Sequence, residues 1–251
     1  MHVNRFQAFA VHLTASATFV GLFLGFTFFV LYPAPLFQVE GAKLAIQIML
    51  GVDIVLGPLL TLVVFKPGKP GLKFDMAVII AIQLAAFIYG ASVIISERPA
   101  IVSFAVDRFV VIAAAESGEM AMEKIDTEQV KLKVIGPTYV YAEMPENAAE
   151  HGLVFGVHEG GADLERRPEF YRDFHTNIER NFPKAINLQE RAEKSEEARV
   201  EIENYLESSG KSYDDIAAYP VAGKHHDMVL VVDKQSKSLA GFIDIYPWGG
   251  R

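Results

Sequence analysis

Three apolar runs in the first 95 residues constrain the fold of this chain more than any other feature of its sequence. Residues 9–32, 43–65 and 74–95 each reach the roughly 20 residues that a helix needs to cross a hydrocarbon core about 30 Å thick. Backbone groups find no water inside a bilayer, so such segments must be helical. The first run is too long for the apolar core of a cleaved signal peptide. The sequence therefore predicts three retained transmembrane helices.

Charged residues are distributed unevenly along the chain. The first 95 residues hold five Lys or Arg and three Asp or Glu, whereas the remainder holds 18 basic and 28 acidic residues. We therefore predict two domains: residues 1–95 as an all-α membrane domain and residues 96–251 as a soluble α+β domain. The acidic surplus argues against nucleic-acid binding, which needs an excess of Lys and Arg. The absence of cysteine excludes disulfides and thiolate chemistry.

Lysines in the short loops predict the orientation in the membrane. The loop at residues 66–73 carries three lysines, and the N-terminal tail adds Arg5. Only Lys43 lies between the first two runs, and Glu40 partly offsets it. By the positive-inside rule, the N-terminus and the lysine loop are cytoplasmic. The domain after residue 95 is then external, although two arginines close behind the third run weaken the asymmetry.

The main candidate membrane interaction site combines Asp53, Gly57, Pro58 and Gln83. Asp53 stands near the middle of the second run, where a carboxylate costs ~2.5–3.5 kcal/mol on insertion scales. Gly57-Pro58 removes a backbone hydrogen bond and predicts a kink. Three interpretations stay open for Asp53: a structural bond to Gln83 or a hydroxyl, a polar contact with another membrane protein, and ion translocation. A single intramembrane acid among three spans makes translocation the weakest.

A candidate helix-packing face lies on the first run. Ala17, Gly21 and Gly25 recur every four residues and would let another helix approach closely. We expect packing against the second and third helices of the same chain, with a helix of another protein as the alternative.

The second half shows alternating strand and helix signals. Residues 101–114, 130–135 and 138–142 are rich in β-branched and aromatic residues and predict strands. Helices are expected at residues 168–182 and, beginning with the N-cap residue Asn187, at residues 187–210. Residues 228–233 and 239–246 flank a polar turn and predict a hairpin.

Catalytic and metal-binding patterns are weak. His225-His226-Asp227 resembles a metal cluster, but neighbouring side chains on a strand point to opposite faces. Ser195 lies in a charged helix without a nucleophile motif around it. We predict neither an enzyme nor a cofactor, and keep a membrane-anchored hydrolase as an alternative.

Four stretches together resemble a known family. They are YPAPL at 32–36, VDIVLGPLLT at 52–61, KFD at 73–75 with IQLAAFIYG at 82–90, and RPAIVSFAVDRF at 98–109. With the closing Pro247-Trp248, they are similar to type IV pilin accessory proteins of the TfpX/TfpZ kind. The resemblance does not extend over residues 116–224. It implies a bacterial inner-membrane protein that aids pilus biogenesis, and it transfers no catalytic residues.

Two functional hypotheses follow. The first is a non-enzymatic assembly factor that contacts the major pilin or the pilus assembly platform through its helices and a periplasmic domain. The second is a membrane-anchored sensor or transporter subunit that binds a small ligand. The second predicts a concave apolar pocket within residues 96–251.

Overall fold

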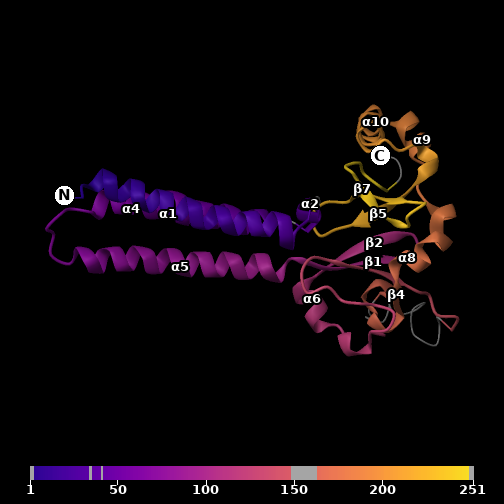
Figure 1. The fold of residues 1–251 in the computed structure, drawn as a ribbon, viewed down its shortest axis with the longest axis horizontal. Helices are drawn as coiled ribbons and strands as arrows, with labels where there is room; N and C mark the ends of the chain where they lie inside the picture. Colours follow the sequence, from indigo (N-terminus) through magenta and orange to yellow (C-terminus); the bar gives the residue numbers. More distant parts are fainter. Residues whose placement is uncertain (1–2, 34–35, 41, 148–162, 249–251) are drawn as a thin grey trace. The chain divides into compact units, whose positions relative to one another are not determined.

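The computed structural model describes residues 3–33, 36–40, 42–147 and 163–248 (Figure 1). The chain forms two compact units. One comprises Met1–Phe37 and Gly41–Arg98, and the other comprises Gln38–Glu40 and Pro99–Arg251. The first unit carries three long apolar helices and the second is an α+β unit, which confirms the predicted fold class.

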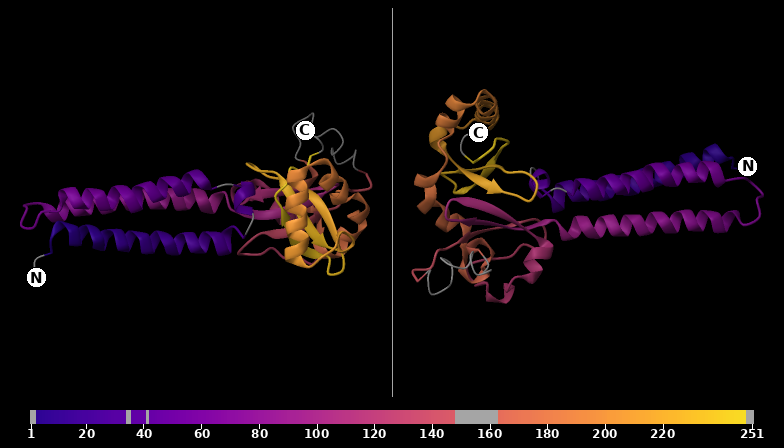
Figure 2. Two further views of the ribbon diagram at one scale, coloured as in Figure 1. Left: turned by 90° about the horizontal axis from the view of Figure 1, so that it is seen from above. Right: turned by 180° about the vertical axis from the view of Figure 1, so that it is seen from behind.

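The membrane unit consists of three helical segments long and apolar enough to cross a bilayer, at Arg5–Leu31, Lys43–Val64 and Leu72–Ser96 (Figure 2). The first comprises α1 (Arg5–Phe26) and a π-helical turn (Thr27–Leu31). The second comprises α3 (Lys43–Leu50), a π-helical segment (Gly51–Leu56) and α4 (Gly57–Val64), and the third is α5 (Leu72–Ser96). These segments confirm the three predicted spans.

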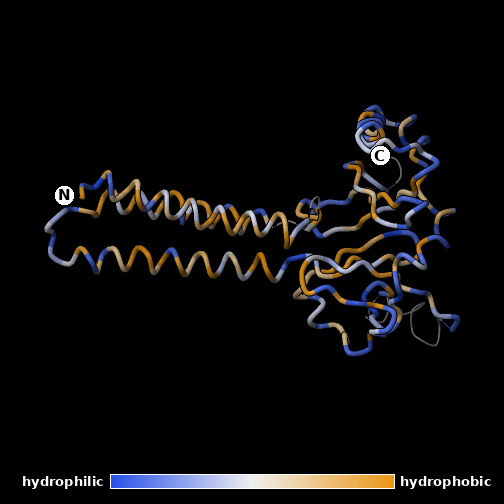
Figure 3. Tube along the Cα trace, in the orientation of Figure 1, coloured by the Kyte–Doolittle hydropathy of each residue, from blue (hydrophilic) through white to orange (hydrophobic). Residues whose placement is uncertain are grey.

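Apolar residues recur along all three long helices of this unit (Figure 3), and many of their large side chains are exposed. Phe29 is 87% exposed and Val63 is 80% exposed, which suits a surface that meets lipid instead of water. The internal contacts are narrow and centre on buried residues such as Val20, Met49 and Ile94. At the end of the first span the Tyr32 hydroxyl donates a hydrogen bond to the backbone oxygen of Ile94 (2.9 Å).

The second span widens where the sequence predicts a kink. Pro58 has no backbone N–H, so it cannot continue the regular ladder of hydrogen bonds. Over Gly51–Leu56 the chain is π-helical, and the Gly57 N–H donates to the backbone oxygen of Val52, five residues back. The span thus accommodates the proline with a π-helical segment, a feature that often occurs at functional sites.

The second unit is built on a seven-stranded mixed sheet with the order β4-β3-β1-β2-β5-β6-β7. The strands are β1 (Pro99–Ala105), β2 (Arg108–Ala113), β3 (Thr138–Ala142), β4 (Tyr171–Asp173), β5 (Ile216–Ala222), β6 (Met228–Asp233) and β7 (Ser238–Ile243). β1 pairs antiparallel with β2 and parallel with β3, placing Ile101 opposite Thr138. The sheet therefore begins three residues after the end of α5.

Both faces of the sheet are covered. On one face, Ile112 and Val140 pack near α6 (Ala114–Glu119) and the 3-10 turns Met122–Lys124, Leu164–Arg166 and Pro168–Phe170. On the same face β5, β6 and β7 pack on α9 (Leu188–Lys194) and α10 (Glu196–Ser209), with Ile202 fully buried. On the other face Phe104, Phe109 and Tyr219 form a ring cluster that reaches Phe174 of α8 (Phe174–Asn177), which is followed by the 3-10 helix Ile178–Lys184.

The structure confirms the strands predicted near 101–114 and 138–142 and the C-terminal hairpin, and corrects three other predictions. Residues 130–135 form no strand, because the chain turns at Gly136 (φ 74°). The helix predicted at 168–182 is replaced by a 3-10 turn, β4, α8 and a second 3-10 helix. The helix predicted at 187–210 is split at Ser195, whose backbone is extended and whose hydroxyl accepts the N–H of Ala198 in the first turn of α10.

A short segment between the first two spans belongs to the second unit. α2 (Leu36–Glu40) contributes Val39, which is fully buried, and the Val39 backbone oxygen accepts a hydrogen bond from the His225 N–H (3.0 Å). A Cβ at Gly223 would lie 2.1 Å from a methyl group of Val39 and 2.8 Å from its oxygen. The β5–β6 connection therefore fits closely around Val39.

Candidate membrane-embedded site

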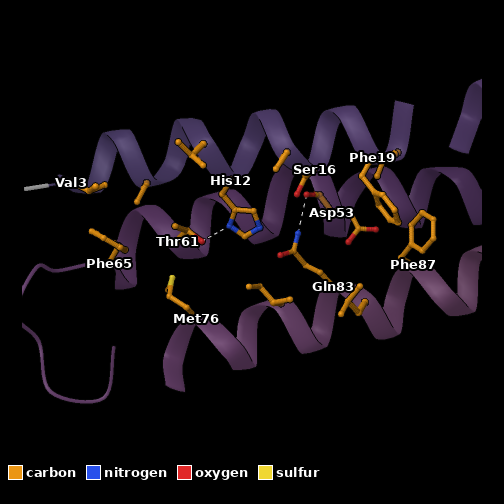
Figure 4. A pocket seen from close by; sticks show the side chains of 16 residues that line it. Val3, His12, Ser16, Phe19, Asp53, Thr61, Phe65, Met76, Gln83 and Phe87 are labelled. Atoms are coloured by element: carbon orange, nitrogen blue, oxygen red, sulfur yellow. Dashed lines mark hydrogen bonds between the residues drawn. The ribbon is translucent and has the colours of Figure 1, made fainter. Parts of the chain in front are cut away.

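The three long helices of the membrane unit line an open groove of about 590 Å³ (Figure 4). Most of its lining is aliphatic or aromatic; the polar members are His12, Ser16, Asp53, Thr61 and Gln83. We call this feature the membrane groove. Figure 4 shows the pair His12–Thr61 toward the Val3 end and the pair Asp53–Gln83 farther along, followed by Phe19 and Phe87.

Gln83 compensates for the N–H that Pro58 lacks. In the π-helical segment the backbone oxygen of Asp53 would receive its hydrogen bond from position 58, where proline has no donor. The Gln83 side chain supplies it instead, through Nε2 at 3.0 Å. Gly57 makes room for this bond, since a Cβ there would lie 2.1 Å from Gln83 Nε2. The structure thus brings together all four residues of the predicted interaction site.

One oxygen of the Asp53 carboxylate has no hydrogen-bond partner in the part of the chain that the structure describes. Its residue is only 5% exposed, and among the described residues its Oδ2 atom has no hydrogen-bond partner. Sequence reasoning offered Gln83 as a partner for this carboxylate, but Gln83 bonds to the main chain of Asp53. A buried polar atom without a partner costs ~1–3 kcal/mol, and more when it is charged. The membrane groove therefore contains an unsatisfied acceptor.

His12 and Thr61 form a second polar pair in the membrane groove. His12 Nδ1 and Thr61 Oγ1 are 2.6 Å apart, joining α1 to α4. Sequence reasoning missed this contact and the role of Thr61. A signal for it exists, because Asp53, Gly57 and Thr61 recur every four residues and share one face of the second span.

Among the described residues, no side chain packs closely against the glycines of the small-residue face of the first span. Ala17 and Gly21 are exposed, and a Cβ at Gly21 or Gly25 would meet no atom within 4 Å. The favoured expectation of internal packing is therefore wrong. α1 instead turns Val20 and Phe23 inward, and the Phe23 ring stands 5.1 Å from that of Phe87. The alternative, a helix of another protein, remains a prediction.

Residues 225–227 serve structural roles in the second unit. His226 Nε2 lies 2.6 Å from Asp244 Oδ1. Asp227 accepts hydrogen bonds from the Gly223 N–H (3.1 Å) and from Trp248 Nε1 (2.7 Å). Within the described ranges, no three His or acidic side chains are grouped to hold a metal ion.

A hollow of about 470 Å³ in the second unit is lined by a mixture of charged, polar and apolar residues. Charged and polar side chains including Arg191, Lys194, Glu197 and His226 surround it. Ser195 also lines it, but its hydroxyl caps α10 by accepting from the Ala198 N–H (3.2 Å). Its lining includes two basic and two acidic side chains, which is more charge than the small-ligand hypothesis predicts for its pocket.

Curated relatives of this chain come from Dichelobacter nodosus. The fimbrial assembly protein of serogroup I is 38% identical over 109 residues, which cover 42% of each chain. The fimbrial assembly protein of serogroups C1 and C2 is 40% identical over 100 residues, covering 39% of this chain and 76% of the relative. The chain belongs to the fimbrial assembly protein family.

Other members of the fimbrial assembly protein family match less completely. The serogroup E1 protein is 38% identical over 100 residues, covering 39% of this chain and 38% of the relative. The chain thus spans less than half the length of the serogroup I and E1 proteins. No protein-family model and no solved structure matches it.

Proposed function

We propose that this protein is a non-enzymatic accessory factor in type IV pilus biogenesis, of the TfpX/TfpZ kind, located in the bacterial inner membrane. It contacts the major pilin or the assembly platform through its transmembrane helices and its external domain. Membership of the fimbrial assembly protein family supports a role in pilus biogenesis. The proposed contact with another protein rests on the Asp53 carboxylate oxygen in the membrane groove that has no hydrogen-bond partner among the described residues.

The chemistry of the membrane groove favours a protein partner over lipid alone. An acyl chain can fill an apolar groove, but it cannot donate a hydrogen bond to Asp53 Oδ2. The three spans of this chain contain no Lys or Arg in their interiors, so a second copy offers no ammonium or guanidinium group at this depth. A helix of another membrane protein with a donor group at this depth would satisfy both the apolar walls and the carboxylate.

The proposed topology places the N-terminus in the cytoplasm. It rests on the three lysines of the loop at residues 66–73 and on Arg5. Residues 1–95 then form the membrane domain, and residues 96–251 form a periplasmic domain that can meet the external part of a pilus subunit.

Gene deletion with complementation tests this function. We expect cells that lack the protein to show fewer surface pili or altered pilus dynamics, and the wild-type gene to restore them. Asp53→Leu should fail to restore piliation at equal protein abundance. The control Val63→Leu, on the lipid-facing surface, should restore it. Normal piliation and dynamics after deletion would contradict the proposal.

A further inference from the structure

The second unit presents an exposed apolar loop at residues 131–136, which we call the apolar loop. Val134 is 91% exposed, Ile135 is 61% exposed and Leu132 is 44% exposed. Soluble proteins seldom project several large apolar side chains together into water. The loop therefore has the composition of a surface that meets an apolar phase.

The apolar loop is held in a defined shape. The Lys133 N–H donates a hydrogen bond to Thr138 Oγ1 (2.8 Å), which closes the segment at its base. Gly136 adopts a left-handed conformation (φ 74°), and Pro137 behind it is buried. Val134 and Ile135 thus form the tip of a tight turn whose base is fixed to β3.

Strand register places the apolar loop at one particular end of the sheet. β3 runs parallel to β1, with Thr138 opposite Ile101. Continuing this register, Gly136 is level with Pro99, the first residue of β1. β1 starts three residues after Ser96, the last residue of α5. The loop therefore lies at the end of the sheet where the chain enters from its third membrane span.

Two lysines flank the apolar tip. Lys131 and Lys133 are both exposed, although the part of the chain after residue 95 is acidic overall. Lysines beside apolar side chains are typical of segments that lie in a membrane interface, where the ammonium groups reach the phosphates of anionic lipids. The charge and the apolar surface of the loop thus both indicate contact with a lipid bilayer.

We propose that residues 131–136 form a lipid-binding loop. Val134 and Ile135 insert into the boundary between headgroups and acyl chains, and Lys131 and Lys133 bind the headgroup phosphates of anionic phospholipids. The loop gives the external unit an attachment to the bilayer in addition to its covalent link to α5. This inference does not depend on the proposed role in pilus biogenesis.

The absence of native cysteine allows a direct test on the full-length chain. Val134→Cys is labelled with an environment-sensitive fluorophore, and the protein is reconstituted in vesicles of phosphatidylethanolamine and phosphatidylglycerol. The matched control is Val106→Cys, because Val106 is 48% exposed beyond the opposite end of β1. We expect nitroxide-labelled lipids to quench the label at 134 and to leave the label at 106 unchanged.

Two results would overturn the proposal. One is equal access of both labels to a water-soluble quencher. The other is a label at 134 that is shielded from water but not quenched by nitroxide lipids, which would mean contact with protein. The double variant Lys131→Gln/Lys133→Gln should lower the ratio of inserted to free loop about fivefold per lysine removed. An unchanged ratio would contradict the role of the lysines.

Discussion

At the scale of single residues, the membrane groove is organised around one missing N–H group. Pro58 cannot donate, Gln83 donates in its place to the Asp53 backbone oxygen, and Gly57 leaves the space that Gln83 needs. Among the described residues, Asp53 Oδ2 has no hydrogen-bond partner. Asp53 thus takes part in the internal hydrogen bonding of the unit and also carries the carboxylate oxygen on which the proposed contact rests.

Gly57→Ala tests this arrangement. The new methyl group would displace the end of the Gln83 side chain and break its hydrogen bond to Asp53. We expect a loss of ~0.6–1.7 kcal/mol in the free energy of unfolding, the range measured for hydrogen bonds between membrane helices. The matched control is Gly21→Ala, where a Cβ meets nothing and the higher helix propensity of alanine applies. Denaturation in mixed micelles measures both; equal effects would contradict the account.

Asp233 holds the β6–β7 turn of the second unit. Its side chain bonds to Lys211, and its Oδ1 accepts from the Ser236 N–H (2.6 Å) and hydroxyl (2.8 Å). The bond to Lys211 is the largest cause that lowers the Asp233 pKa, followed by those to Ser236. A lowered pKa means that the folded state favours the ionised carboxylate.

Acid should therefore weaken this turn. The contribution of Asp233 to stability is full above pH ~4, near the pKa of an unfolded aspartate, and is lost as the pH falls through the lowered pKa of the folded state. We expect Asp233→Asn to cost ~1–3 kcal/mol at pH 7 and less in acid. The fluorescence of Trp248, the single tryptophan, reports unfolding. A pH-independent difference between variant and wild type would contradict the assignment.

At the scale of elements, the sequence predicted the helices and strands that depend mainly on their own residues. Long apolar runs identified the three spans, and β-branched runs identified β1, β2 and the C-terminal hairpin. Residues 130–135 carry the same β-branched signal but form no strand, because the chain turns at Gly136. β4 was missed because its three residues gain their strand conformation by pairing with β3, a contact distant in sequence.

The contact of Val39 is an element-scale feature that no sequence pattern indicated. Gly223→Ala should disrupt it, because the new Cβ would meet backbone oxygens of Val39 and His226 as well as a methyl group. We expect ~1–3 kcal/mol of destabilisation, as for other overpacked cores. Gly118→Ala is the control, since a Cβ there meets nothing within 4 Å. Trp248 fluorescence during denaturation measures both, and similar losses would contradict a specific fit.

At the scale of the whole molecule, the sequence identified the residues of the candidate site but not their arrangement. Asp53, Gly57, Pro58 and Gln83 are conspicuous because polar and helix-distorting residues are rare in apolar runs. Their geometry depends on which oxygen of Asp53 accepts the hydrogen bond from Gln83. In the π-helical segment this acceptor is the backbone oxygen. The small-residue face is exposed because of the rotation of α1 about its own axis. A helix that is apolar on all sides has no amphipathic pattern from which this rotation can be predicted.

The central claim is that the membrane groove binds a helix of another membrane protein, and site-specific photocrosslinking tests it most directly. A photoreactive residue replaces Ile80, which lines the groove and is 50% exposed, in cells that assemble pili. Val63, which is 80% exposed and faces lipid, is the control position. We predict that Ile80 crosslinks to a pilin or a pilus assembly protein, within one helical turn of a hydrogen-bond donor, and that Asp53→Leu abolishes this product. Crosslinks from Ile80 to lipid alone, or a protein product unaffected by Asp53→Leu, would contradict the claim.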